Sequence, residues 1–232
     1  MTINRCSRII VALFAFFGLA SLACGQTADS PDGLVKVKPR RMDLAWLRPG
    51  TDFRVYTKVI IDRTQVAFRP GWRSDYNLDA STGAWVTKDQ ADRIMAAAQT
   101  NFDEIFRDAF RKAGYEVVTA PGPDVLRVNS GILDLEVNAP LGQSAPGVTW
   151  IITAGQAALI VEVRDGATNA LLGRVADRRA TQNLGRQIAS TATNTYDFRL
   201  LFELWAGICT NALGELKSVS PIPKHLKPNQ RL

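Results

Sequence analysis

The sequence is poor in the residues that most enzymes use for chemistry. It contains 1 histidine and 3 cysteines in 232 residues. The single histidine, His225, excludes a histidine-based catalytic triad and a metal site built from several histidines. The chain also has no glycine-rich phosphate loop, no Gly-x-Ser-x-Gly turn and no Cys-x-x-Cys pair. We therefore assign no catalytic residue, no metal site and no cofactor from the sequence.

Cysteine is also too scarce for a disulfide framework. Cys6 lies in an N-terminal segment that we expect to be removed, and Cys24 directly follows that segment. With Cys24 acylated, as we expect below, Cys209 is left alone, so no disulfide framework can form within the mature chain in an oxidising compartment. Because Cys209 lies in an apolar helical pattern, we expect it to be a small core residue rather than a reactive thiol.

A hydrophobic run long enough to cross a membrane is missing as well. The uncharged apolar run Ile9–Leu22 would cover only about 21 Å as a helix, short of the ~30 Å hydrocarbon core of a bilayer. The run follows Arg5 and Arg8 and precedes small residues, which is the layout of a bacterial secretory signal. We expect residues 1–23 to be a signal peptide, and a permanent membrane span is the alternative.

The residue after this segment suggests how the protein is attached to a membrane. Cleavage before Cys24 would make it the first residue of the mature chain, as lipoprotein processing requires, although Ser21 and Leu22 stand in the reverse of the usual order. Acyl chains on this cysteine would anchor the chain stably. The polar residues 24–33 suit a short tether.

This anchoring predicts a location. We expect an exported lipoprotein whose partner is the membrane, reached through the lipid on Cys24, and whose domain faces the periplasm. Gly25, rather than aspartate, follows the cysteine, which favours the outer over the inner membrane. A soluble periplasmic protein is the alternative.

The net charge of +6 does not describe a basic globule. Removal of Arg5 and Arg8 with the signal leaves 26 basic and 22 acidic residues, and the excess lies from Lys217 onward. Residues 24–216 are formally neutral, so a nucleic-acid partner is not expected. We expect residues 220–232 to be a basic disordered tail, either a plain solvated terminus or a contact for anionic lipid.

Two segments have the three- and four-residue apolar spacing of helices that cover a core. The first is Lys88–Ala113, where Thr87 and Gln90 form a capping box and Gly114 ends the helix. The second is Asp197–Leu216. Each apolar stripe must be buried against a sheet.

Six segments are rich in β-branched residues or alternate in polarity, which predicts strands at 55–61, 64–68, 115–119, 125–137, 149–164 and 171–179. Asp62–Arg63 would be a tight turn or a bulge in one strand, Gly131 would mark a bulge, and residues 72–85 would form a loop. We therefore predict an α+β fold: one domain, residues 34–219, with a single mostly antiparallel sheet of about five or six strands and two long helices on one face.

Two charged clusters are candidate binding sites. Asp134 and Glu136 are two residues apart on a strand, which would place both carboxylates on one face as a cation site or a like-charge pair with a raised pKa. Asp177, Arg178 and Arg179 end a strand and could bind an anion. The alternatives are the polar face of a half-exposed strand and a charge-guarded sheet edge.

A third candidate pairs aromatic rings with cations. Arg69, Trp72 and Arg73 lie in the turn after Phe68, as in a contact to a glycan or an anionic lipid. The alternative is a turn that covers the edge of the sheet.

Four segments carry a family resemblance: Val35–Lys38, Ala45–Gly50, Tyr56–Asp62 and Val66–Phe68. Through them the chain, over about residues 34–219, resembles a family of uncharacterised bacterial lipoproteins, domain of unknown function 3313. The resemblance implies a periplasm-facing lipoprotein and carries over no catalytic residues. The order of elements is also similar to the curli secretion channel subunit and the amino-terminal domain of TolB, at the level of fold only.

Together these features favour a cell-envelope lipoprotein that acts as a non-enzymatic interaction or assembly module with an envelope protein partner. The alternative is an envelope hydrolase or a small-ligand or glycan-binding protein that uses the carboxylates and arginines named above.

Overall fold

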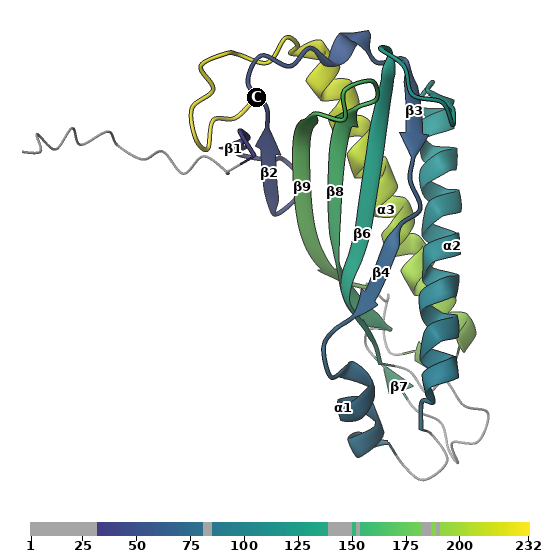
Figure 1. Ribbon diagram of the computed structural model, residues 1–232. Helices are drawn as coiled ribbons and strands as arrows, with labels where there is room; N and C mark the ends of the chain where they lie inside the picture. Colours follow the sequence, from purple (N-terminus) through teal and green to yellow (C-terminus); the bar gives the residue numbers. More distant parts are fainter. Residues whose placement is uncertain (1–31, 81–84, 139–149, 152–153, 182–186, 189–190) are drawn as a thin grey trace, which may run out of the picture.

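The structure is a computed structural model, and it describes residues 32–80, 85–138, 150–151, 154–181, 187–188 and 191–232. It shows one large sheet packed by two long helices, α2 (Lys88–Lys112) and α3 (Thr191–Ser218) (Figure 1). The predicted α+β class is therefore confirmed. The predicted signal peptide, Cys24 and most of the tether lie outside the described residues.

The large sheet has eight strands in the order β1-β2-β9-β8-β6-β3-β5, with β4 also paired to β6. A separate pair joins β7 and β10. The remaining elements are β1 (Val35–Val37), β2 (Leu44–Leu47), a 3-10 turn (Phe53–Val55), β3 (Lys58–Ile61), β4 (Gln65–Phe68), α1 (Trp72–Asp79), β5 (Glu116–Val117), β6 (Val125–Val137), β7 (Trp150–Ile151), β8 (Gly155–Asp165), β9 (Leu171–Ala180) and β10 (Gln187–Ile188).

The sheet is mixed, which corrects the prediction of a mostly antiparallel sheet with five or six strands. β3 runs parallel to both β5 and β6, and β4 runs parallel to β6. Parallel neighbours need a long crossover, and α2 supplies it between β4 and β5. The strands β1 and β2 were not predicted because they are only 3 and 4 residues long.

The break between β3 and β4 is not a hairpin turn, because both strands pair with β6 in the same direction. Side chains of α2 bond the backbone at this break. Asp103 Oδ1 accepts a hydrogen bond from the Thr64 N–H at 3.0 Å, and Gln99 donates to the Thr64 carbonyl. The interrupted edge is thus tied to the helix that covers it, and no backbone group of Thr64 is left unpaired.

The bulge in β6 lies at Asp134 rather than at Gly131. Asp134 has φ 49°, and the pairing with β8 shifts between Leu133 and Glu136. A bulge inserts one residue and changes the facing of the strand. Even-numbered residues before the bulge and odd-numbered residues after it, such as Leu135, therefore point into the core.

A short helix replaces part of the loop predicted at 72–85. α1 begins after Gly71, whose φ of 79° turns the chain, and its first residue, Trp72, is buried. The ring of Trp72 stacks on Phe68 at a centroid distance of 4.1 Å. Asn77 then bonds both backbone groups of Val86, which closes the segment against the start of α2.

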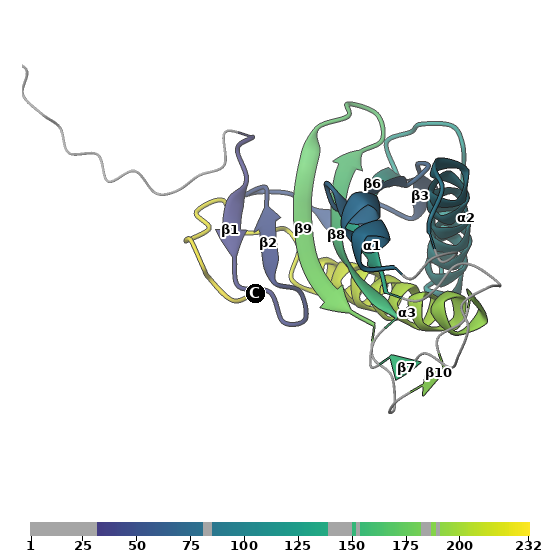
Figure 2. The same ribbon diagram turned by 90° about the horizontal axis from the view of Figure 1, so that it is seen from below.

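The long helices follow the sequence pattern with one difference. The capping box of Thr87 and Gln90 is present at the start of α2. α3 begins at Thr191, six residues before the predicted Asp197. Seen from below, α3 runs along one face of the sheet and α2 stands beside β3 (Figure 2). The buried aromatic rings of both helices, Phe102, Phe106, Phe202 and Trp205, form the centre of the core with the facing residues of β6 and β8.

The predicted disordered tail is instead packed on the domain, so that prediction is wrong for residues 220–232. Ile222 is 1% exposed and exchanges backbone hydrogen bonds with the turn at Gly50 and Thr51. Gln230 accepts a hydrogen bond from the backbone of Lys38. The burial of two apolar residues, Ile222 and Leu226, stabilises the packed segment despite its positive charge. No helix in the described ranges is long and apolar enough to span a bilayer.

Candidate functional site

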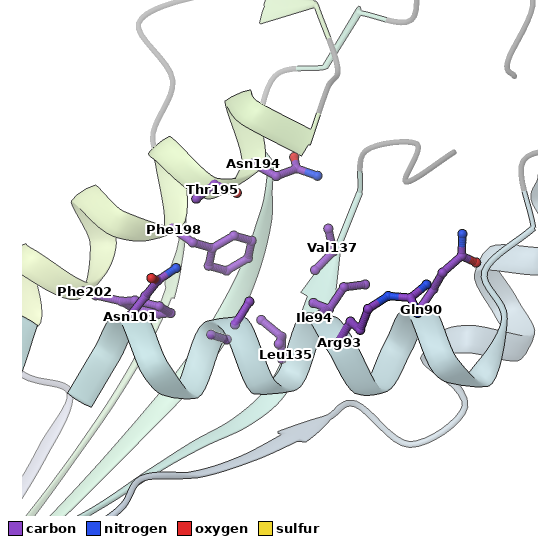
Figure 3. Close-up of a pocket in the computed structure, with 12 residues that line it drawn as sticks. Gln90, Arg93, Ile94, Asn101, Leu135, Val137, Asn194, Thr195, Phe198 and Phe202 are labelled. Atoms are coloured by element: carbon purple, nitrogen blue, oxygen red, sulfur yellow. The ribbon is translucent and has the colours of Figure 1, made fainter. Parts of the chain in front are cut away.

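A pocket of about 340 Å³ lies between the first halves of α2 and α3, over the end of β6 (Figure 3). This size is at the lower end of the range of small-molecule sites, about 300–1,000 Å³. Its walls come from three elements. They are Gln90, Arg93, Ile94, Ala97, Ala98 and Asn101 of α2, Leu135 and Val137 of β6, and Asn194, Thr195, Phe198 and Phe202 of α3.

The apolar part of the pocket is formed by residues that the fold holds rigidly. Leu135 and Val137 are 1% and 3% exposed, and they face the helices because they follow the bulge at Asp134. Phe202 packs edge-on against Phe102 of α2 at a centroid distance of 5.3 Å, so the two helices touch at this end. The pocket is therefore closed at one end by packed rings.

Small side chains leave the space open. Ala97 and Ala98 stand on α2 where larger apolar residues would fill the gap to α3. Ala98 and Ile94 remain only half-buried, although both belong to the apolar stripe of the helix. The ring of Phe198 lies between the two helices (Figure 3).

The polar groups gather mainly at the other end. Gln90, Arg93, Asn194 and Thr195 all come from the first turns of their helices (Figure 3). The side-chain oxygen of Gln90 is used by the capping box. Arg93 is exposed and is the only charged side chain among the described residues that line the pocket. The described part of the chain gives Arg93 no ion pair.

Asn194 is the one described lining residue whose polar side chain is buried without hydrogen-bond partners. It is 5% exposed, and neither the oxygen nor the nitrogen of its carboxamide has a hydrogen-bond partner among the described residues. A buried amide without partners costs about 1–3 kcal/mol. A ligand in the pocket with polar atoms at this end would remove that cost.

The carboxylates Asp134 and Glu136 do not form a joint site. Asp134 forms an ion pair with Arg178. Glu136 forms one with Arg69, at 2.7 Å between Oε1 and Nε. Each acid is paired with its own arginine, so the structure offers no shared cation site at this pair.

Asp177 and Arg179 form an ion pair, and the contacts of Asp177 connect parts of the fold. The Asp177 carboxylate accepts hydrogen bonds from Trp205 Nε1 at 2.8 Å, from Arg179 Nε at 2.5 Å and from the backbone N–H of Asp43 at 3.1 Å. Its side chain is 1% exposed. Asp177 thus joins β9 to α3 and to the segment before β2.

The turn after Phe68 covers the sheet edge. Arg69 bridges Glu136 and Asp75 of α1, and Trp72 donates its indole N–H to the carbonyl of Val137 at 3.3 Å. Arg73 is exposed on α1. The aromatic surface of Trp72 is therefore buried rather than presented to a ligand.

The thiol of Cys209 is not chemically activated. It is a free cysteine that packs against the core, and burial raises its pKa to about 12, with the Asp177 carboxylate adding to the effect. At neutral pH the thiol is therefore protonated and a poor nucleophile. Nor do the described residues contain a cluster of three or more side chains suited to hold a metal ion.

The pocket was not predicted because its residues have the spacing of an ordinary core stripe. Ile94, Ala98, Phe198 and Phe202 all belong to the apolar pattern of their helices. The signal that distinguishes them is the run of small residues at 96–98, which leaves space that a stripe of larger residues would fill. Whether that space faces a second helix depends on tertiary packing, which periodicity alone does not describe.

A family model described as a protein of unknown function, DUF3313, matches residues 28–207. The chain belongs to this family. The match covers the sheet, α2 and the part of α3 that lines the pocket. None of the curated proteins matches the chain.

Solved structures show distant likenesses. A dodecamer of PelC from Paraburkholderia phytofirmans is 10% identical, with a TM-score of 0.36 over 72% of this chain and 96% of that one. Protein XCC0632 from Xanthomonas campestris is 11% identical, with a TM-score of 0.36 over 79% and 95%. A neuraminyllactose-binding hemagglutinin homolog from Helicobacter pylori is 7% identical, with a TM-score of 0.31 over 74% and 92%. Likenesses this distant say nothing about what this chain binds.

Proposed function

We propose that the protein is a non-enzymatic binding module of the bacterial cell envelope that holds a small ligand in the pocket between α2 and α3. The observation that carries the proposal is the pocket itself: a largely apolar space of about 340 Å³ with a few polar groups at one end. That combination is typical of small-molecule sites.

The pocket is tested with an uncharged apolar fluorescent probe, N-phenylnaphthylamine. Ala97→Trp adds a large ring at a residue that lines the pocket, whereas Ala96→Trp adds the same ring at a neighbouring alanine of α2 that does not line it; both alanines are exposed. The probe should bind the wild type and Ala96→Trp alike and should lose at least about tenfold in affinity with Ala97→Trp. Equal binding by the two variants would contradict the proposal.

The location rests on the N-terminal sequence. We propose that a lipid on Cys24 anchors the chain to the outer membrane, with residues 24–33 as the tether and the domain facing the periplasm. The short apolar run Ile9–Leu22 after two arginines supports this. Cys24→Ala should move the protein from the membrane to the soluble fraction. Two results together would contradict the lipid anchor: membrane retention of this variant, and an unmodified Cys24 in the wild type by mass spectrometry.

A protein partner in the envelope is part of the proposal, since an anchored binding module must pass on or present its ligand. Crosslinking in intact cells followed by mass spectrometry should recover the same envelope protein from the wild type in repeated experiments. Failure to recover any reproducible partner would contradict this part of the proposal. The alternative is a hydrolase or a small-ligand or glycan-binding protein that uses loop carboxylates and arginines. The pairing of Asp134 with Arg178 and of Glu136 with Arg69 favours the binding module.

A further inference from the structure

We propose that the pocket binds a single-chain amphiphile with a carboxylate head, a medium-chain fatty acid or a close relative, and that Arg93 binds the head. This inference rests on the proposed function, because it names the ligand class of the same pocket. Three features of the pocket support it: its shape, its charge and the unmet hydrogen bonds of Asn194.

The shape favours a chain. The lining residues of α2 recur at each turn from Gln90 to Asn101, which spans about 16 Å at 1.5 Å per residue. Those of α3 run from Asn194 to Phe202 along the same pocket. A volume of about 340 Å³ spread over this length is a slender channel. One extended hydrocarbon chain matches it better than a compact ring system or a lipid with two chains.

The distribution of polarity fixes the direction of the chain. Arg93 and Asn194 lie at the end formed by the first turns of the two helices, whereas Phe202 lies toward the other end, where Asn101 is the polar lining residue (Figure 3). An apolar tail therefore extends past Ile94, Leu135 and Phe198 toward the packed rings. The head stays at the end where solvent and polar groups meet.

The charge of the pocket selects an anion. Among the described residues that line it, Arg93 is charged and none is acidic. The acid next to it in sequence, Asp92, is bound to Lys88 at 2.5 Å. The N-termini of α2 and α3 lie at the same end and add positive potential. A carboxylate can accept two parallel hydrogen bonds from an arginine fork and a further one from an amide N–H.

Asn194 completes the head-group site. Its buried NH₂ group can donate to a carboxylate oxygen, which gives the unpartnered amide a strong acceptor. An alcohol head would offer a weaker acceptor and no charge for Arg93. The structure thus predicts discrimination by the head group rather than by the chain.

The experiment compares dodecanoate with dodecanol, which share a chain and differ in charge. Dodecanoate, below its micelle concentration, and dodecanol, below its solubility limit, are each titrated by calorimetry into the protein carrying Cys24→Ala and prepared without detergent. Dodecanoate should bind at least about tenfold more tightly than dodecanol, which corresponds to about 1.4 kcal/mol. Arg93→Gln should remove this preference and Arg93→Lys should keep most of it. Arg73→Gln, at an exposed arginine outside the pocket, is the matched control.

The outcomes separate this inference from the proposed function. Equal affinity for dodecanoate and dodecanol, with Ala97→Trp blocking both, overturns the carboxylate and leaves the pocket as a binding site. A preference for dodecanoate that survives Arg93→Gln overturns the role of Arg93. Binding of neither compound, or binding that Ala97→Trp does not weaken, overturns both proposals.

Discussion

Asp177 offers the sharpest test of how this fold is held together. Its buried carboxylate accepts hydrogen bonds from three donors, Trp205 of α3, Arg179 of the same strand and the backbone N–H of Asp43 before β2. Asp177→Asn keeps the size of the side chain but removes the charge and turns one acceptor into a donor. At least one of the three donors is then left without an acceptor in a buried site.

Asp177→Asn replaces one carboxylate oxygen by an NH₂ group, and we expect this small change to lower the free energy of unfolding substantially. An unpaired buried donor costs about 1–3 kcal/mol, and a hydrogen bond to a charged group is worth about 1.5–3 kcal/mol. We therefore expect Asp177→Asn to lower the free energy of unfolding by about 2–4 kcal/mol.

The neighbouring ion pair provides a matched control. Asp134 binds Arg178, the residue beside Arg179, but its side chain is 38% exposed. Exposed pairs contribute about 0–1 kcal/mol. Asparagine also tolerates the positive φ of 49° at this position, so Asp134→Asn introduces no backbone strain.

Urea denaturation followed by tryptophan fluorescence measures both variants. Asp177→Asn should move the midpoint strongly with an unchanged slope, and Asp134→Asn should move it little. Similar stabilities for Asp177→Asn and the wild type would refute the structural role of Asp177. They would return the Asp177–Arg179 pair to the list of binding-site candidates.

Three further predictions test other parts of the structure. Asn194→Leu should stabilise the ligand-free protein by about 1 kcal/mol, because it removes an unpartnered buried amide, and a loss of stability in denaturation would contradict this. Gly155→Ala should destabilise by more than about 2 kcal/mol, since a Cβ there would lie 1.9 Å from the Glu136 carbonyl oxygen; a wild-type midpoint would show that this approach is not tight. The raised pKa of Cys209 keeps the folded thiol protonated while the unfolded one ionises near its ordinary value of 9.0, so stability should fall by up to about 1.4 kcal/mol per pH unit between that value and about 12. Cys209→Ala should lack this part of the pH dependence, and identical pH profiles would show that the thiol is solvated.

Local sequence signals identified the strongest elements. The capping box at Thr87 and the periodic stripe placed α2 correctly. The facing switch within β6 was also expected, three residues from its true position at Asp134. In each case the signal is local, because caps, bulges and periodicity act within a few residues.

The errors came from features that depend on tertiary contacts. The parallel pairing of β3 with β6 follows from the crossover through α2, and nothing in the β3 sequence specifies a direction. The tail was predicted to be disordered from its charge and prolines, but Ile222 finds a buried place beside the turn at Gly50. The pairing of the candidate site residues also depends on tertiary structure, since Asp134 of β6 reaches Arg178 of β9 across β8, and Glu136 of β6 pairs with Arg69 after β4.

The central claim is that the pocket between α2 and α3 binds a chain with an anionic head. The most direct measurement is the structure of the protein with dodecanoate bound. The account predicts one chain along Ile94 and Phe198, with its carboxylate at hydrogen-bond distance, about 2.7–3.2 Å, from the Arg93 guanidinium. A chain bound elsewhere on the protein, or one with its carboxylate at the Phe202 end, would contradict the account.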